Sequence, residues 1–190
     1  NYIKIINDEN KRLGVQVEKV LSIAQSEKEN YSIKFEKISI NKIIKDSVDI
    51  NSFKIKKRDG EIILNLCSDE LFIYGNYDHL INVFNNLLDN ANKYSTSKPI
   101  INISSTRINN MLEVMISDNG IGIKNSNIDK IFDKFYREPQ GNIHNVKGFG
   151  LGLSYVKNIL NKHKATINVE SKINHGTKFI INFKSYGRNK

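Results

Sequence analysis

The sequence has little cysteine and no long apolar run, and each shortage excludes a class of protein. Cys67 is the single cysteine among 190 residues, so a disulfide framework is excluded and a reducing, cytosolic setting is expected. It stands in the apolar run IILNLC and is predicted to be a small buried hydrophobic side chain. No apolar run approaches the roughly 18 residues of a membrane-spanning helix, and no charged segment leads into an apolar one as in a signal peptide.

The composition is that of an ordinary globular protein with a basic balance. Hydrophobic residues make up 39% and charged residues 26%, and the formal net charge is +9. Such a charge calls for a nucleic-acid partner to be considered, but the lysines are scattered along the chain and form no stripe. We therefore expect no nucleic-acid partner, because a nucleoside triphosphate or an acidic protein fits the charge equally well.

The first 26 residues carry apolar side chains at alternating steps of three and four. This spacing is the seam of a coiled coil or helical bundle, and it predicts a helix that pairs with a second copy. A helix lying on a globular core is the alternative. Because the sequence begins inside this helix, we expect further segments upstream of it. The seam positions are Ile3, Ile6, Asn10, Leu13, Val17, Val20 and Ala24.

The first half of the remaining chain predicts two helices and two short strands. Residues 32–40 are expected to be extended, and Asn41 is expected to cap a helix over 42–53. The β-rich runs 62–66 and 71–74 are predicted to pair with each other across the Cys-Ser-Asp-Glu turn. Asp78 is expected to cap a strongly periodic helix over 79–95. Its apolar face is predicted to comprise Leu80, Val83, Phe84, Leu87, Leu88 and Ala91.

The second half predicts two hairpins, two glycine segments and a further helix. The whole pattern indicates an α+β fold, a two-layer sandwich with helices on one face of a mixed, mostly antiparallel sheet. The expected elements are a hairpin of 100–106 with 111–117, a glycine loop at 118–123, a short aromatic helix at 128–136, a polar loop at 137–147, a helix ending near 162, and a hairpin of 165–171 with 177–183.

Amide and amine side chains gather on one face of the helix expected at 79–95. Asn86 and Asn90 are four residues apart, and Lys93 follows Asn90 one turn later. An amide oxygen can join a Mg²⁺ shell made of phosphate oxygens and water, and a lysine can meet a phosphate as a point charge. A solvated polar face is the alternative in a chain this rich in asparagine.

The stretch DNGIGI, residues 118–123, combines a carboxylate with two glycines at the end of an expected strand. Asp118 can accept a hydrogen bond from an exocyclic amine, and Gly120 and Gly122 let a ligand approach the backbone. An ordinary Asp-Asn-Gly turn is the alternative.

Two further segments flank the polar loop. In IFDKFYR, the aromatic side chains of Phe132, Phe135 and Tyr136 are expected to anchor a small helix in the core, and Arg137 is placed to reach a phosphate. In GFGLGL, the glycines 148, 150 and 152 lead into a helix and present free N–H groups and a positive dipole end to an anion. No strand precedes these glycines and no GK[ST] follows, so neither a Rossmann nor a Walker A site is expected.

Taken in order, NLLDNANKYS, DNGIGI, IFDKFYR, GFGLGL and HGTKFIINF resemble the N, G1, F, G2 and G3 boxes of bacterial sensor histidine kinases. Each segment is weakly specific alone, whereas all five in the family's order form a specific pattern over residues 75–183. The first 26 residues resemble the second helix of that family's dimerisation and phosphoacceptor hairpin. The resemblance implies the Bergerat ATP-binding fold, which type II topoisomerases, MutL-type repair proteins and a chaperone family share.

On the matching positions the resemblance implies a set of roles. Asp118 binds the adenine amino group, and Asn90, with Asn86 nearby, coordinates Mg²⁺. Lys93, Asn86 and Arg137 are the expected catalytic residues, with Arg137 reaching the terminal phosphate. The remaining residues expected around ATP are Tyr94, Gly120, Gly122, Ile123, Gly148, Gly150, Leu151, Gly152 and Thr177. Ile123 and Leu151 wall the adenine pocket, Thr177 lies at its floor, and the three glycines hinge a lid over 137–147.

One departure from the family limits what this chain does alone. The acceptor histidine of the family stands in a motif like S-H-E-[LI]-R, which this sequence lacks. His79, His144, His163 and His175 stand in other contexts and are expected to be surface or loop residues. The chain is therefore expected to bind ATP without phosphorylating itself at the usual position.

The resemblance also implies partners and an organisation. Residues 1–30 are expected to be the partial hairpin helix, 31–186 the catalytic domain and 187–190 a tail. We expect a homodimer through the N-terminal helix, a response-regulator receiver domain as phosphoryl acceptor, a cytoplasmic location, and membrane attachment only through missing upstream segments. Alternatives are an ATPase machine, for which position 86 should be glutamate, a serine-directed anti-sigma kinase, and a non-enzymatic nucleotide-sensing or protein-binding module.

Overall fold

The computed structural model describes residues 33–68, 71–137 and 149–186, together with positions 2–3, 6–7, 9–10, 14 and 17. The chain divides into two compact units, residues 1–33 and 34–190. In the described parts, no helix has the length and apolar character needed to cross a bilayer.

The positions described between 2 and 17 are helical, as the spacing of the apolar residues predicts. Ile3, Ile6 and Val17 lie on the predicted seam, and they are 84%, 61% and 56% exposed. The seam positions 13, 20 and 24 lie outside the described residues. The assignment of residues 1–30 to a dimerisation hairpin therefore stays a prediction.

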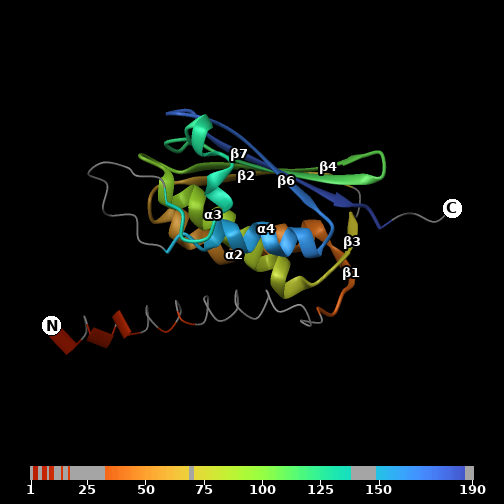
Figure 1. Cartoon of the computed structure of the whole chain (residues 1–190), viewed down its shortest axis with the longest axis horizontal. Coiled ribbons are helices and arrows are strands. Elements are labelled where there is room, and N and C mark those ends of the chain that lie inside the picture. The colour runs from red at the N-terminus through yellow and green to blue at the C-terminus, as the bar shows by residue number, and fades with distance from the viewer. Residues whose placement is uncertain are drawn as a thin grey trace. The chain divides into compact units, whose positions relative to one another are not determined.

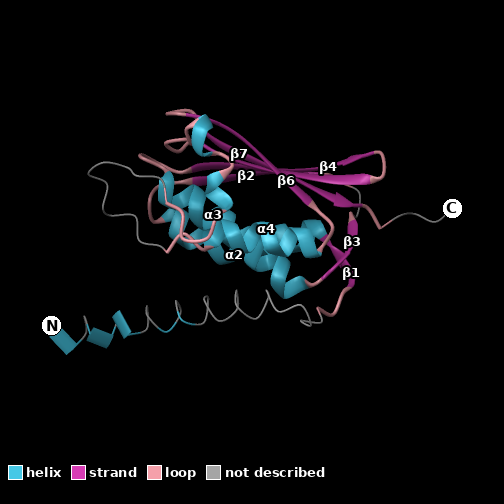
Figure 2. Ribbon diagram, viewed as in Figure 1, coloured by secondary structure: helices cyan, strands magenta, loops and turns pink. Residues whose placement is uncertain are grey.

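The second unit is a sheet covered on one face by helices (Figures 1 and 2). The strand order is β2-β4-β5-β7-β6, with β2 parallel to β4 and all other neighbours antiparallel. This confirms the predicted α+β sandwich. The strands are β2 (Glu61–Leu66), β4 (Ile100–Ile108), β5 (Met111–Asp118), β6 (Thr166–Lys172) and β7 (Gly176–Lys184); the helices are α2 (Ile40–Lys56), α3 (Tyr77–Tyr94) and α4 (Gly152–Lys162).

The predicted pairing of residues 62–66 with 71–74 was wrong. β1 (Glu36–Ser39) pairs antiparallel with β3 (Phe72–Gly75) in a separate two-stranded sheet, while β2 pairs with β4. The Cys67 N–H extends the β2–β4 pairing by donating to the Ser105 carbonyl at 3.1 Å. β3 also holds the end of the domain, because the Tyr186 N–H donates to the Phe72 carbonyl at 3.0 Å.

The core lies between the inner face of the sheet and the three helices. All six residues of the predicted apolar face of α3 are buried, which confirms the period of that helix. Strand residues at alternate positions meet them, and burying each of these side chains stabilises the fold by about 1.5–3 kcal/mol. The strand residues are Ile101, Ile103, Leu112, Val114, Ile116, Phe179, Ile181 and Phe183.

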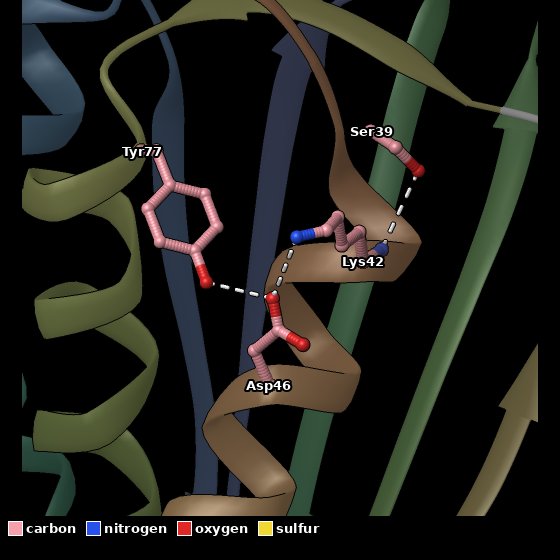
Figure 3. Close-up of polar contacts among 4 residues, drawn as sticks. All are labelled: Ser39, Lys42, Asp46 and Tyr77. Atoms are coloured by element: carbon pink, nitrogen blue, oxygen red, sulfur yellow. Dashed lines mark hydrogen bonds and ion pairs between the residues drawn. The ribbon is translucent and has the colours of Figure 1, made fainter.

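Both helices are capped two residues earlier in the sequence than predicted. Ser39 caps α2 by accepting a hydrogen bond from the Lys42 N–H at 3.4 Å (Figure 3), and Asn76 caps α3 by accepting one from the His79 N–H at 3.0 Å. Asn41 serves elsewhere, because its amide donates to the Cys67 carbonyl at 2.9 Å and accepts from the Ser105 hydroxyl at 2.8 Å. It therefore fastens α2 to the ends of β2 and β4.

A polar cluster joins the first two turns of α2 to the start of α3 (Figure 3). The Tyr77 hydroxyl donates to Asp46 Oδ2 at 2.6 Å, and Lys42 Nζ lies 3.4 Å from the same oxygen. The hydrogen bond from Tyr77 lowers the pKa of Asp46, and the same bond raises the pKa of Tyr77 to about 12. Because the side chains of Lys42 and Asp46 are 68% and 34% exposed, the ion pair contributes little to stability.

Three smaller expectations were also wrong. Residues 128–136 form no regular helix; the segment contains the 3₁₀ turn Lys130–Phe132, and a second 3₁₀ turn, Asn125–Asn127, precedes it. Phe135 has a positive φ of 63° and is 67% exposed, so it is not a core anchor. Cys67 is only half-buried, because it lies just beyond β2 at the border of the sheet.

Among the described histidines, His163 is buried, so its predicted surface position was wrong. It is 7% exposed and ends α4. Its Nε2 accepts a hydrogen bond from the Asn76 N–H at 3.0 Å, and its Nδ1 lies 2.7 Å from the Ile159 carbonyl. Burial lowers the pKa of His163. The neutral ring, with Nδ1 as donor and Nε2 as acceptor, fits both contacts and joins the end of α4 to the start of α3.

The buried ring should make stability depend on pH. Because the pKa of His163 is lower in the folded state than its usual value of 6.5, the stabilisation is complete above that value and is lost as the pH falls below it. The free energy of unfolding, measured with urea at pH 5–8, should rise with pH. His163→Gln should reduce that slope by up to about 1.4 kcal/mol per pH unit. The exposed His175→Gln should leave the slope as in wild type. An unchanged slope in His163→Gln would contradict this assignment.

Candidate functional site

The C-terminal half of α3 presents the predicted amide and amine side chains. Asn86 and Asn90 are half-buried, and the Asn86 amide donates to the Asn82 carbonyl at 2.7 Å. Lys93 Nζ lies 2.5 Å from Asp89 Oδ2, with the two side chains 38% and 31% exposed. A partly exposed pair of this kind is weak, so a phosphate can draw the Lys93 ammonium away at little cost.

Asp118 ends β5 beneath the glycine loop. Its Oδ1 accepts hydrogen bonds from the N–H groups of Gly120 at 2.8 Å and Thr177 at 3.3 Å. Burial raises the pKa of Asp118, and the two backbone donors act against that rise. Among the described residues both hydrogen bonds go to Oδ1, so Oδ2 keeps its capacity to accept from a ligand.

The glycine loop is held between the end of α3 and the β6–β7 turn. The Ile121 N–H donates to the Tyr94 carbonyl at 3.1 Å, and its carbonyl accepts from the Asn174 N–H at 2.8 Å. Gly122 has a φ of +70°, and a Cβ there would lie 2.1 Å from the Lys172 carbonyl oxygen. The loop therefore needs glycine at 122, because its backbone touches the hairpin.

Hydroxyl groups support the same loop from β6 and β7. Ser171 Oγ accepts from the Ile123 N–H at 2.8 Å and donates to the Gly176 carbonyl at 2.8 Å. It also lies 2.9 Å from Thr177 Oγ1. Thr177 is 8% exposed, so the residue predicted at the pocket floor is buried directly beside Asp118.

Sequence reasoning missed Asn119 and Ser171. The Asn119 side chain accepts from the Ile100 N–H and donates to the Lys98 carbonyl, both at 3.0 Å, and so closes the segment between α3 and β4. Its place in an Asp-Asn-Gly turn was a signal for local hydrogen bonding. Ser171 gave no such signal, because a serine on a strand is commonly a surface residue.

The second glycine segment begins α4. Gly150 has a φ of +70°, its carbonyl accepts from the Phe135 N–H at 3.0 Å, and a Cβ there would lie 2.5 Å from the Tyr136 carbonyl oxygen. Leu151 stands at the N-cap and has no side-chain acceptor, so it leaves the first amides of α4 for another group. Gly152 is the first helical residue. Gly148 lies outside the described residues.

The structure joins some of the predicted residues and leaves others apart. Hydrogen bonds join Asp118 to Gly120 and Thr177. They also join the glycine loop to Tyr94 through Ile121, and to the β6–β7 hairpin through Ile121 and Ile123. Asn86, Asn90 and Lys93 form a neighbouring row on α3. Arg137 is exposed at the end of a described segment.

The donor set suits a magnesium ion that arrives with its nucleotide. In the described residues no group of three His, Cys, Asp or Glu side chains could hold a metal ion. A cage made of protein carboxylates is therefore not built there, whereas the amides of Asn86 and Asn90 stand beside a lysine on one helix face. One or two amide oxygens fit the few protein ligands that Mg²⁺ takes when phosphates supply the rest.

Comparisons with known proteins show which family and which fold the chain shares. The family described as "Histidine kinase-, DNA gyrase B-, and HSP90-like ATPase" matches residues 75–187. The chain is 44% identical over 179 residues to the sensor protein RprX of Bacteroides fragilis, covering 93% of this chain and 34% of that protein. The chain spans about a third of the length of the curated relatives it matches.

Solved structures share the fold. Full-length ShkA in complex with AMPPNP has a TM-score of 0.83 at 18% identity, covering 97% of this chain and 38% of that chain. The histidine kinase ThkA, in complex with the response regulator TrrA, has a TM-score of 0.75 at 23% identity, covering 100% of this chain and 52% of that chain.

The close approach of Gly176 to the backbone beneath the loop gives a test of the site's construction. Gly176 has a φ of +87°, and a Cβ there would lie 1.8 Å from the Asp118 carbonyl oxygen. We expect Gly176→Ala to destabilise the domain by about 2–4 kcal/mol in chemical unfolding, through strain and overpacking. Gly14→Ala, where a Cβ meets nothing within 4 Å, should cost nothing. A Gly176→Ala variant as stable as wild type would contradict the packing described here.

Proposed function

Since the chain belongs to the family of histidine kinase-, DNA gyrase B- and HSP90-like ATPases, we propose how its own residues bind ATP and pass on the phosphoryl group. Residues 75–187 are the ATP-binding catalytic domain of a sensor histidine kinase. The proposed reaction moves the γ-phosphoryl group of ATP to a histidine outside this sequence. The observation that carries the proposal is the half-buried Asp118, whose second carboxylate oxygen faces no protein donor among the described residues.

Asp118 is proposed to recognise adenine. The N–H groups of Gly120 and Thr177 fix one carboxylate oxygen, and the other accepts a hydrogen bond from the exocyclic amine. Ile123 and Leu151, which are half-buried and buried, are proposed as apolar walls for the purine. A Cβ on Gly120 would lie 2.8 Å from Asp118 Oδ1, and one on Gly122 would lie 2.1 Å from the Lys172 carbonyl oxygen, so protein contacts already require glycine at both positions.

The phosphates are proposed to lie between α3 and the start of α4. Asn90, assisted by Asn86, supplies amide oxygen to Mg²⁺, and Lys93 exchanges Asp89 for a phosphate oxygen. The uncapped first amides of α4, reached through Gly150 and Gly152, meet the same anion. Arg137 is proposed to approach the terminal phosphate from the border of the polar loop.

The residue at position 86 favours transfer of the γ-phosphoryl group over hydrolysis of ATP. An amide cannot take a proton from water as a glutamate can, so Asn86 provides no general base for hydrolysis. The proposed chemistry breaks the bond between the γ-phosphorus and the bridging oxygen and forms a bond from phosphorus to an imidazole nitrogen, with ADP leaving and the imidazole losing a proton. Lys93 and Arg137 contribute positioning and charge neutralisation.

Two partners belong to the proposal. Ile3, Ile6 and Val17 expose most of their apolar surface in this chain, which supports a second copy covering the seam in a homodimer. A response-regulator receiver domain is proposed to take the phosphoryl group onto an aspartate, and the complex of the similar ThkA with its response regulator TrrA supports this.

Recognition of adenine can be separated from stability at Asp118. In Asp118→Asn the amide oxygen still accepts from the two backbone donors, while an NH₂ group replaces the acceptor that meets adenine. Because burial disfavours the charged form of Asp118, the melting temperature should be equal to or higher than that of wild type. Mg-ATP affinity by calorimetry should fall about 10- to 100-fold, the size of a lost charged hydrogen bond.

Asp49→Asn is the matched control, since Asp49 lies on α2 away from the loop. It should leave both the melting temperature and the affinity unchanged. Equal affinity of Asp118→Asn and wild type would remove the proposed adenine contact.

Transfer itself is tested with Mg-ATP and a histidine-bearing hairpin supplied as a separate polypeptide. We expect acid-labile phosphate on the hairpin, reduced at least about tenfold by Asn90→Ala because the metal loses a ligand. The exposed Asn161→Ala on α4 should behave as wild type. Nucleotide binding without transfer to any hairpin would instead favour a nucleotide-sensing module.

A further inference from the structure

The C-terminal end of α3 is closed by groups from three separate segments. Helices leave their last carbonyls without intrahelical partners, and a glycine beyond the end often supplies the missing donors. Here Ser95 ends α3 in an extended conformation. The Ala91 carbonyl accepts from the Ser95 hydroxyl at 2.8 Å, and the Tyr94 carbonyl accepts from the Ile121 N–H at 3.1 Å.

The third group is the guanidinium of Arg58, which comes from the turn between α2 and β2. Its Nη1 donates to the Asn92 carbonyl, and its Nη2 donates to the Ser95 carbonyl at 2.8 Å. Longer contacts of 3.3 and 3.4 Å reach Asn92 Oδ1 and the Ser97 carbonyl. The two nitrogens of a planar guanidinium can donate to two neighbouring carbonyls at once. A lysine ammonium lacks this fixed geometry.

The backbone around Arg58 is arranged to place this side chain. The Arg58 N–H donates to the Ile55 carbonyl at 3.0 Å, and Asp59 follows with a φ of 54°. A Cβ on Gly60 would lie 2.7 Å from the Pro99 carbonyl oxygen, which also accepts from the Glu61 N–H at 2.7 Å. The whole turn is therefore docked on the segment that connects α3 to β4.

The turn of α3 that Arg58 holds is the one that carries Lys93 and Tyr94. The Tyr94 carbonyl fixes the glycine loop through Ile121, and Ser95 Oγ lies 3.4 Å from Asn119 Oδ1. We propose that Arg58 is a positioning residue of the nucleotide site, which sets the last turn of α3 and, through it, the loop beside Asp118. This inference rests on the proposed function, because it concerns the same site.

Arg58 lies outside the ligand-contacting set, so its effect must pass through backbone geometry. Without the fork, the carbonyls of Asn92 and Ser95 turn toward water, and the last helical turn loosens together with Lys93. The carbonyl of Tyr94 then holds Ile121 less firmly. A helix cap without a positioning role would change the stability of the domain and leave the nucleotide affinity of the folded protein unchanged.

The experiment compares wild type with Arg58→Ala, Arg58→Lys and the control Lys57→Ala in the full chain. Lys57→Ala removes an exposed positive charge one residue earlier in the same turn. Calorimetry measures Mg-ATP affinity, and amide hydrogen exchange of the nucleotide-free protein compares Ile121 with Val114, a core residue of β5. Thermal unfolding confirms that each variant is folded.

We expect Arg58→Ala to bind Mg-ATP roughly tenfold more weakly than wild type, as for a lost hydrogen bond to a charged group. Exchange at Ile121 should accelerate while that at Val114 follows the global stability, and Lys57→Ala should match wild type. The affinity and the Ile121 exchange rate of Arg58→Lys should lie between those of wild type and Arg58→Ala. Arg58→Lys replaces Arg58→Ala in the comparison if the alanine variant does not fold.

The inference is overturned if folded Arg58 variants keep wild-type affinity and wild-type exchange at Ile121. A different result separates it from the proposed function. If wild type itself binds no Mg-ATP, the proposed function fails, whereas faster exchange at Ile121 in Arg58→Ala still shows that Arg58 holds the loop.

Discussion

Close contact between backbones is the constraint on which the candidate site depends. The glycine loop after β5 lies against the β6–β7 hairpin at Gly122 and Gly176, at separations that no side chain permits. Because these segments touch through their main chains, Asp118 and Thr177 come within hydrogen-bonding distance, although 59 positions separate them in sequence. The carboxylate is therefore oriented by peptide groups, which are more rigid than side chains.

The same arrangement makes the Asp118 charge unfavourable for stability but useful for recognising a ligand. Burial disfavours the charge on Asp118, and two backbone donors offset that cost only in part. A group kept under such conditions gains most when a ligand supplies a further donor. The pairing of Lys93 with Asp89 works in the opposite way, since a partly exposed ion pair holds the ammonium in place yet releases it easily.

Periodicity and turn chemistry were enough to predict most elements, because both depend on neighbouring residues. The buried face of α3 and the two hairpins follow from spacing alone. Pairing of β2 with β4 did not, since a parallel partner lies beyond an intervening helix and leaves no local signal. The caps at Ser39 and Asn76 were missed because Asn41 and Asp78 are equally good cap residues. In the site, motif residues were found from sequence, whereas supports such as Ser171 and Arg58 depend on tertiary contacts.

The small sheet of β1 and β3 has a mechanical consequence. β3 is bonded on one side to β1, where the domain begins, and also accepts a hydrogen bond from Tyr186, near the end of the described chain. Tension applied between these two ends is therefore borne within this small sheet. The hydrogen bonds that take this load belong to β1, β3 and Tyr186, and none of them involves β5, α3 or the glycine loop.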